Sequence, residues 1–85
     1  MYDWDDNNEE HIARHGVERW EAEDALEDAD LVPFSARGGR AGILGMTEDG
    51  RLLAVIFERR SGAIRVVTAR DTTSNEKGTY RRRNK

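Results

Sequence analysis

The chain contains no cysteine and only one proline, and none of its apolar runs is long. Without cysteine, neither a disulfide framework nor a zinc site built on thiolates is possible. No apolar stretch approaches the roughly 18–20 residues that a membrane-spanning helix needs, and the acidic start of the chain is unlike a signal peptide. We therefore expect a soluble cytoplasmic protein that does not associate with a membrane.

Several catalytic and binding signatures are also missing. No glycine-rich phosphate loop ends in Lys-Ser or Lys-Thr, and no nucleophile-elbow motif surrounds any of the serines. No spacing typical of a helix-turn-helix appears, and the predicted internal helices are acidic, so they would repel a phosphate backbone. We therefore expect neither a classical hydrolase nor a nucleotide enzyme, and no direct binding to DNA.

What the chain does have is a strong separation of charge. Residues 1–34 carry twelve acidic and two basic residues, a formal charge of −10, whereas residues 35–85 carry twelve basic and five acidic residues, a charge of +7. The net charge of −3 therefore conceals a bipolar molecule. A cationic half can bind a polyanion with release of its counterions, and an acidic half cannot. A solvated surface with uneven use of acids and bases accounts for the same pattern.

The acidic half predicts two helices. The first begins near Asp6, where Asp6 and Glu9 have the spacing of a capping pair, and it ends at Gly16. The second covers residues 18–29 and has its alanines on one stripe, with acids around the rest. Residues 1–4 predict a short edge strand before them.

The basic half predicts three strands, over residues 40–47, 51–58 and 63–70. These segments are rich in branched aliphatic residues, and Asp49-Gly50 and Ser61-Gly62 separate them. Both dipeptides are strong hairpin signals, so the strands form an antiparallel meander. The middle segment is apolar on both faces, which favours a place at the centre of the sheet.

The C-terminal segment predicts a short helix and a charged, frayed tail. Thr73 and Glu76 have the spacing of a capping box, and the tail covers residues 81–85. We expect a single α+β domain over residues 1–85. Two N-terminal helices would pack on a three- or four-stranded antiparallel sheet, with a short C-terminal helix.

An ordered set of segments resembles the BrnT toxins, the toxin halves of BrnT/BrnA toxin–antitoxin pairs. The matching positions are Trp4, residues 10–17, 49–53 and 64–71, Glu76 and Tyr80. The resemblance implies a RelE-like ribonuclease fold and metal-independent cleavage of RNA that arrests translation, with no cofactor. It also implies a BrnA-like antitoxin that covers the active surface. In such families the toxin–antitoxin complex, and not the toxin itself, contacts the promoter DNA.

Metal-independent RNA cleavage requires a base for the ribose 2′-hydroxyl, positive charge at the phosphate and a proton for the leaving 5′-oxygen. Histidine is the natural base near neutral pH, and the planar, permanently charged arginine side chain suits the phosphate. His15 ends the first helix and matches the family's histidine. Arg65 and Arg70 match the arginines of the family's final strand. Tyr80 can stack on a base or donate its phenol proton. We therefore name as catalytic candidates His15, Arg70, Arg65 and Tyr80.

The two strand arginines pose a geometric problem. Residues 65 and 70 differ in parity, so a regular strand would place them on opposite faces. Both can reach one phosphate only if a bulge intervenes or if Arg70 lies past the strand end. An ion pair with the acidic helices is the alternative role for Arg70, and for Arg65 the alternative is that arginine simply suits an exposed strand position.

Four further basic residues are candidates for RNA binding: Arg14, Arg51, Arg81 and Arg82. Arg14 stands where better-known members have lysine, and Arg51, directly after a turn, also fits a solubilising role. His11 and His15, one turn apart, could clip a metal ion, but no motif supplies a third ligand, so we expect no metal site.

A catalytically silent binding module with the same fold is the alternative function. Arg14 in place of lysine, Met46 in place of the usual arginine, and the acidic helices favour it. In that case the sheet would dock a segment of a partner protein, and loss of His15 would change nothing.

Overall fold

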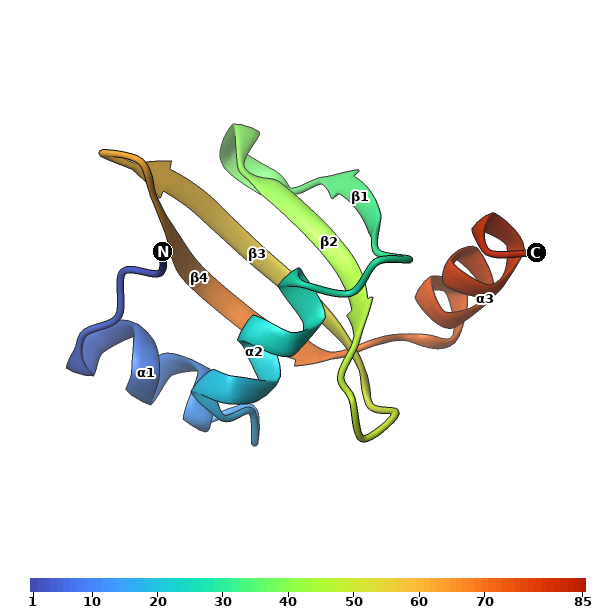
Figure 1. Cartoon of the computed structure of the whole chain (residues 1–85), viewed down its shortest axis with the longest axis horizontal. Helices are drawn as coiled ribbons and strands as arrows, with labels where there is room; N and C mark the ends of the chain where they lie inside the picture. Colours follow the sequence, from blue (N-terminus) through green and yellow to red (C-terminus); the bar gives the residue numbers. More distant parts are fainter.

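The computed structural model describes residues 1–85 and shows an antiparallel sheet with two helices on one face and a third helix at its end (Figure 1). The elements are α1 (Asp6–Ala13), α2 (Arg19–Leu26), β1 (Val32–Ser35), the 3₁₀ turn η1 (Arg37–Gly39), β2 (Ala41–Met46), β3 (Leu52–Arg60), β4 (Ala63–Asp71) and α3 (Ser74–Arg83). The strands lie in the order β1-β2-β3-β4, and all neighbours are antiparallel. This confirms the predicted α+β class, the meander and the C-terminal helix. None of the helices has the length and apolar character needed to cross a membrane.

The sheet contains one strand that the sequence did not predict. β1 is short and pairs only with β2, with Pro33 opposite Ile43. Proline is tolerated in an edge strand because its missing N–H would otherwise face away from the sheet. The sheet therefore has four strands, and β3 lies in its interior as expected.

The segment before α1 does not form the expected edge strand. It makes one isolated parallel bridge, between Tyr2 and Ile64, at the outer edge of β4. The N–H of Ile64 donates to the carbonyl of Met1 at 2.9 Å, and the N–H of Asp3 donates to the carbonyl of Ile64 at 2.8 Å. The prediction was wrong because two hydrogen bonds fasten this segment without a regular ladder.

The helix caps differ from expectation at one end of the chain and agree at the other. The N-cap of α1 is Asp5, one residue earlier than predicted. Asp5 and Asn8, and not Asp6 and Glu9, form the capping box. Thr73 and Glu76 cap α3 as predicted. The expected frayed tail was wrong up to residue 83, because α3 continues through its three terminal arginines. Cations in the last turn of a helix are favoured by the helix dipole.

The main core lies between the sheet and the first two helices. It consists of buried apolar residues from α1, the α1–α2 loop, α2 and strands β2 to β4: Ile12, Val17, Ala22, Ala25, Ile43, Leu53, Val55, Phe57, Val66 and Ala69. A smaller cluster of Val32, Leu44 and Ala54 lies on the other side, where Phe34 and Tyr80 pack against it. Tyr80 belongs to α3, so α3 docks on the side of the sheet that α1 and α2 leave open.

A β-bulge in β4 decides which side of the sheet its arginines occupy. Ile56 pairs with Thr68 but the next residue, Phe57, pairs with Val66, so Val67 is an extra residue. On either side of this irregularity, Ala54 pairs with Arg70 and Glu58 pairs with Arg65. Positions 54 and 58 of the regular strand share one face. Arg65 and Arg70 therefore lie on the same face, which satisfies one of the two conditions set by the sequence.

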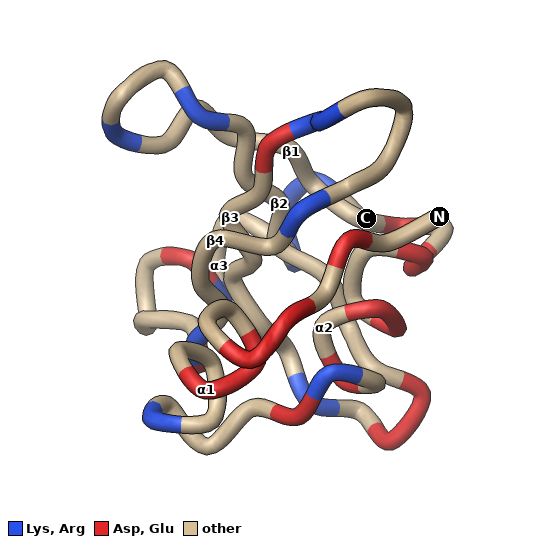
Figure 2. Tube along the Cα trace, turned by 90° about the vertical axis from the view of Figure 1, so that its left-hand side faces the viewer, with Lys and Arg blue, Asp and Glu red and all other residues tan.

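The two charge types separate only partly in space. Figure 2 shows acidic positions along α1 and α2, and basic positions both in the loops at the top of the view and beside the acidic positions at the bottom. Several acids of the first half nevertheless contact the second half, as Glu21 does with Arg51 and Asp5 with Arg65. The charge separation therefore also serves to hold the two halves together.

Candidate functional site

Arg51 stands at the end of the sheet where three segments meet. Its Nε donates to Oδ1 of Asp71 at 3.0 Å, and its Nη1 donates to the carbonyl of Gly16 at 2.9 Å and to Oε1 of Glu21 at 3.0 Å. The hydrogen bond from Arg51 lowers the pKa of Asp71. One guanidinium thus joins the α1–α2 loop, α2 and the end of β4.

Arg70 lies beside this junction and is fixed by the start of α3. Its two terminal nitrogens donate to Oε1 and Oε2 of Glu76 at 2.8 and 3.0 Å, and Nη1 also donates to the carbonyl of Asp71 at 3.2 Å. The hydrogen bond from Arg70 lowers the pKa of Glu76. An arginine has five N–H donors, so Nε and one N–H of Nη2 remain without a partner. Arg70 is therefore oriented by Glu76 and keeps donors for a further anion.

His15 lies in the loop directly before Gly16, whose carbonyl accepts from Arg51. The imidazole is exposed and makes no hydrogen bond within the chain. Its ring centroid is 5.6 Å from that of His11, in an edge-to-face arrangement. No group of three His, Asp or Glu side chains is arranged to hold a metal ion. His15 therefore belongs to the loop that Arg51 contacts through Gly16, and its ring has no hydrogen-bond partner within the chain.

Tyr80 belongs to the same end of the sheet, but its hydroxyl already has a hydrogen-bond partner. Its O–H donates to Oδ2 of Asp28 at 2.6 Å. Burial, together with this hydrogen bond, raises the pKa of Tyr80 well above that of a free phenol. The phenol proton is therefore held by Asp28, and what Tyr80 offers to the surface is its ring.

Arg65 shares a face with Arg70 but lies at the other end of β4, roughly 13–16 Å along the strand. Its guanidinium is 3.0 Å from Oδ2 of Asp5 and 3.6 Å from Oδ1 of Asp3. Only 15% of the side chain is exposed. The structure does not bring Arg65 to the end of β4 where Arg70 lies.

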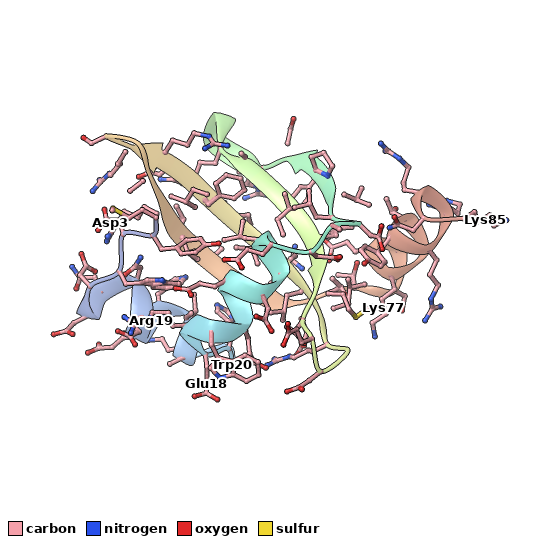
Figure 3. All side chains as sticks on the ribbon, viewed as in Figure 1. Asp3, Glu18, Arg19, Trp20, Lys77 and Lys85 are labelled. Atoms are coloured by element: carbon pink, nitrogen blue, oxygen red, sulfur yellow. The ribbon has the colours of Figure 1, made fainter.

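The remaining predicted binding residues are spread over the surface. Arg14 is exposed at the end of α1 and forms no ion pair, and Arg82 on α3 donates to the hydroxyl of Thr79 at 3.2 Å. Arg81 lines a pocket against the sheet. Trp20 lies outside the alanine stripe of α2. It is 45% exposed and projects from the start of α2 away from the sheet (Figure 3).

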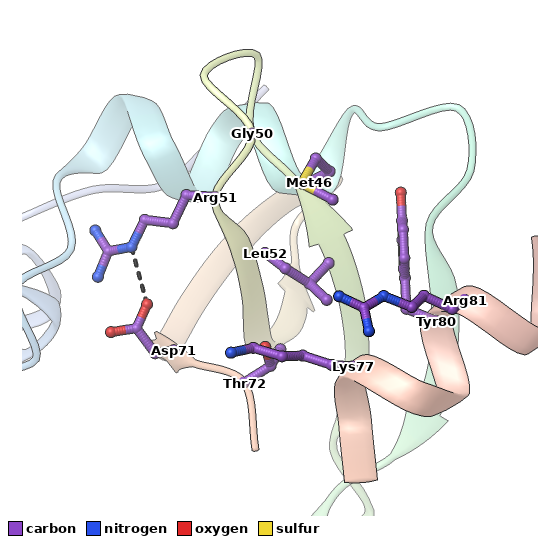
Figure 4. Close-up of a pocket in the computed structure, with 9 residues that line it drawn as sticks. All are labelled: Met46, Gly50, Arg51, Leu52, Asp71, Thr72, Lys77, Tyr80 and Arg81. Carbon is purple, nitrogen blue, oxygen red and sulfur yellow. Dashed lines mark hydrogen bonds and ion pairs between the residues drawn. The ribbon is translucent and has the colours of Figure 1, made fainter. Parts of the chain in front are cut away.

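The pocket beside Arg81 was not predicted from the sequence. It has a volume of ≈ 380 Å³ and lies between α3 and the ends of β2, β3 and β4 (Figure 4). Its lining residues are Met46, Gly50, Arg51, Leu52, Asp71, Thr72, Lys77, Tyr80 and Arg81. The spacing of Lys77 and Arg81, one helical turn apart on a helix that the capping box already predicts, was the available signal.

One family model matches most of the chain. The family model described as the ribonuclease toxin BrnT of type II toxin–antitoxin systems matches residues 4–76. A comparison with curated proteins gives no match. The matched residues take in α1, α2, all four strands and the cap of α3, including His15, Arg51, Arg65 and Arg70. The chain therefore belongs to the BrnT family of ribonuclease toxins.

Proposed function

We propose that this chain is a toxin that cleaves RNA without a metal ion, arrests translation in the cytoplasm and is neutralised by a BrnA-like antitoxin. The observation that carries the proposal is the guanidinium of Arg70, which Glu76 orients and which keeps two free N–H donors, together with the exposed imidazole of His15 in the loop that Arg51 joins to the end of β4. Family membership supports the same reaction class.

In the proposed reaction, His15 removes the proton of the ribose 2′-hydroxyl. The 2′-oxygen then attacks the adjacent phosphorus, a new P–O bond forms, and the bond to the 5′-oxygen breaks. Arg70 has two uncommitted N–H donors, which would stabilise the charge that builds up on the phosphate oxygens. The protonated imidazole, or a water molecule, returns a proton to the leaving 5′-oxygen. The products are a 2′,3′-cyclic phosphate and a 5′-hydroxyl.

The other basic residues act on the strand outside the reacting phosphate. Arg65 lies on the same face as Arg70, one end of the strand away, so it would meet a flanking phosphate. Arg14, Arg51, Arg81 and Arg82 would add attraction that weakens with salt. Tyr80 would offer its ring for stacking, because its hydroxyl is held by Asp28.

An RNA cleavage assay in excess EDTA tests the proposal. We expect His15→Ala and Arg70→Ala each to lower the cleavage rate by about 10²-fold or more, because each removes a group acting in the transition state. His11→Ala is the matched control, since it removes an exposed imidazole one turn earlier. A 2′-deoxy residue at the cleaved position should block the reaction. The proposal would be contradicted if RNA stayed intact at enzyme excess, or if His11→Ala lowered the cleavage rate as much as His15→Ala.

Growth of cells that express the chain tests its biological role. Expression alone should arrest growth, and co-expression of the neighbouring reading frame should restore it. If that frame does not bind the chain, the proposed antitoxin is wrong.

A catalytically silent binding module is the second candidate, and a specific observation favours it. Three arginines of the basic half, Arg51, Arg65 and Arg70, are each paired with carboxylates. Under this alternative, His15→Ala and Arg70→Ala would leave the effect of expression unchanged. The wild-type chain would still bind a partner protein.

A further inference from the structure

The pocket between α3 and the end of the sheet contains a buried hydroxyl without a partner. Thr72 is 9% exposed, and its Oγ1 forms no hydrogen bond. It lines the pocket together with residues of α3. Buried polar groups in folded proteins are nearly always hydrogen-bonded, so the partner of this hydroxyl has to come from outside the chain: a water molecule, an ion or a ligand atom.

Two cations of α3 face the same pocket. Lys77 and Arg81 are four residues apart and therefore share a side of the helix. Neither forms an ion pair or a side-chain hydrogen bond within the chain. In Figure 4 both charged groups extend from α3 toward the sheet. The one carboxylate of the lining, Asp71, is paired with Arg51 at 3.0 Å. The pocket thus presents two cations that form no ion pair. Beside the hydrogen bond from Arg51, the charge of Lys77 also helps to lower the pKa of Asp71.

The pocket also has apolar lining, from Met46, Leu52 and the ring of Tyr80, whose hydroxyl donates to Asp28. An apolar lining that includes an aromatic ring suits a nucleobase, because stacking on aromatic side chains tolerates every base. A cationic rim suits a phosphate, which lysine and arginine bind through charge-assisted hydrogen bonds. The volume of ≈ 380 Å³ lies in the range of small-ligand sites.

We propose that this pocket binds one nucleotide of an RNA strand. Lys77 and Arg81 hold its phosphate, the hydroxyl of Thr72 supplies a further hydrogen bond, and the base lies on the ring of Tyr80. The site rests on the proposed function, because the RNA substrate supplies the nucleotide. Thr72 follows Arg70 by two residues, so the bound nucleotide would be a neighbour of the reacting phosphate and would fix the position of the strand.

Titration with AMP, followed by backbone amide NMR, tests the site without any requirement for cleavage. We expect AMP to shift the amides of Thr72, Lys77 and Arg81, inorganic phosphate to shift the same amides more weakly, and adenosine to shift them least. A free phosphate site, as opposed to a nucleotide site, would give equal affinity for phosphate and AMP and would overturn the proposal. So would AMP shifts confined to other parts of the chain.

Three variants separate the contributions of Lys77 and Arg81 to AMP binding from a general effect of charge. Lys77→Ala and Arg81→Ala should each weaken AMP binding by about tenfold or more, because each removes a charged hydrogen-bond partner. Arg83→Ala is the matched control, since it removes an equal charge from the same helix outside the pocket lining. Equal weakening by all three would show a general charge effect and contradict the site.

Thr72→Val distinguishes a binding role from a structural one. The substitution keeps the shape of the side chain and removes a hydroxyl that has no partner, so the melting temperature should not fall. AMP binding should nevertheless weaken, and RNA cleavage should show a raised KM with little change in kcat. Unchanged AMP affinity would overturn the role of Thr72.

The two proposals fail separately. AMP binding here by a protein that leaves RNA intact would reject the ribonuclease function and uphold the nucleotide site. RNA cleavage by a protein whose pocket ignores AMP would do the reverse.

Discussion

At the scale of single residues, Arg51 contributes more to the stability of the fold than its position after a turn indicates. Its side chain is 28% exposed and that of its partner Glu21 is 13% exposed. Removing one member of such a pair leaves the other as a partly buried, uncompensated charge. The three groups that it joins come from segments separated by 20 to 35 residues. Arg51 therefore stabilises the tertiary arrangement of the site, whether or not it contacts RNA.

Arg51→Met tests this role. The variant keeps most of the length of the side chain but leaves Glu21 and Asp71 unpaired, so we expect the free energy of unfolding to fall by about 2 kcal/mol. Arg19→Met is the control, because the pair between Arg19 and Glu9 is exposed and long, at 3.9 Å. Its loss should cost less than about 0.5 kcal/mol. Urea denaturation of both variants decides; similar losses would mean that the Arg51 junction is no stronger than a surface pair.

At the scale of the elements, a glycine sets how closely α2 approaches the sheet. Gly45 of β2 is buried, and a Cβ placed there would fall on the carbonyl oxygen of Ala25 in α2. That oxygen belongs to the backbone, so the helix itself would have to shift. The contact lies within the main core, which Ala25 and its neighbours form.

Gly45→Ala should therefore destabilise the chain by about 2–3 kcal/mol through overpacking. The matched substitution Gly78→Ala lies in α3, where a Cβ meets only the far end of the Arg82 side chain at 3.2 Å. Alanine is the better helix former, so this variant should be more stable by up to about 1 kcal/mol. Thermal unfolding of the two variants gives shifts of opposite sign if the argument holds, and a neutral Gly45 variant would contradict it.

At the scale of the whole molecule, acids of the first half and arginines of the second half hold the chain together. Asp5 accepts from Arg65 across 60 residues of sequence, and Glu21 accepts from Arg51 across 30. The formal charges of −10 and +7 are thus partly neutralised by ion pairs within the fold. Contacts of this kind depend on the ionisation of the carboxylates.

Stability should consequently fall in acid. The pKa values of Asp5, Asp71 and Glu76 are each lowered, in every case chiefly by a hydrogen bond from an arginine. A lowered pKa in the folded state stabilises the fold above the ordinary pKa of the group, and this stabilisation is lost as the pH falls through the folded value. The loss should begin below about pH 4.5, the ordinary value for glutamate.

Melting temperatures between about pH 7 and pH 2.5 measure this effect. Glu76→Gln keeps an acceptor for the cap of α3 but cannot titrate. Its melting temperature should be lower than that of the wild type at neutral pH and should fall less in acid. Parallel curves for the two proteins would show that the pair between Arg70 and Glu76 does not contribute to the acid sensitivity.

Local signals in the sequence predicted most of the fold. The turns at Asp49-Gly50 and Ser61-Gly62 fix the meander because each needs positive φ, which Gly50 supplies in the first turn and Ser61 together with Gly62 in the second. The cap formed by Thr73 and Glu76 is equally local. β1 escaped prediction because it is short and contains Pro33, and its pairing depends on a neighbour that follows it in the chain.

The candidate site was predicted less completely, because its contacts are not local. The sequence identifies His15 and Arg70 as candidates, but it does not reveal that Glu76 orients Arg70 or that Arg51 reaches Gly16. The pocket around Thr72 depends on where α3 docks. The bulge in β4 did leave a trace, since inward-facing Val66 and Ala69 differ in parity, and that change of phase could have predicted it.

The bulge has a consequence for how this chain can vary in length. Val67 is the extra residue, and the residues on either side of it alternate between the faces as in a regular strand once Val67 is left out of the count. If Val67 took a regular place in the ladder instead, either Arg65 would enter the core in place of Val66, or Arg70 would enter it in place of Ala69. A one-residue deletion at Val67 should thus leave both arginines on the same face, whereas a one-residue deletion in a regular part of the sheet would turn part of a strand over.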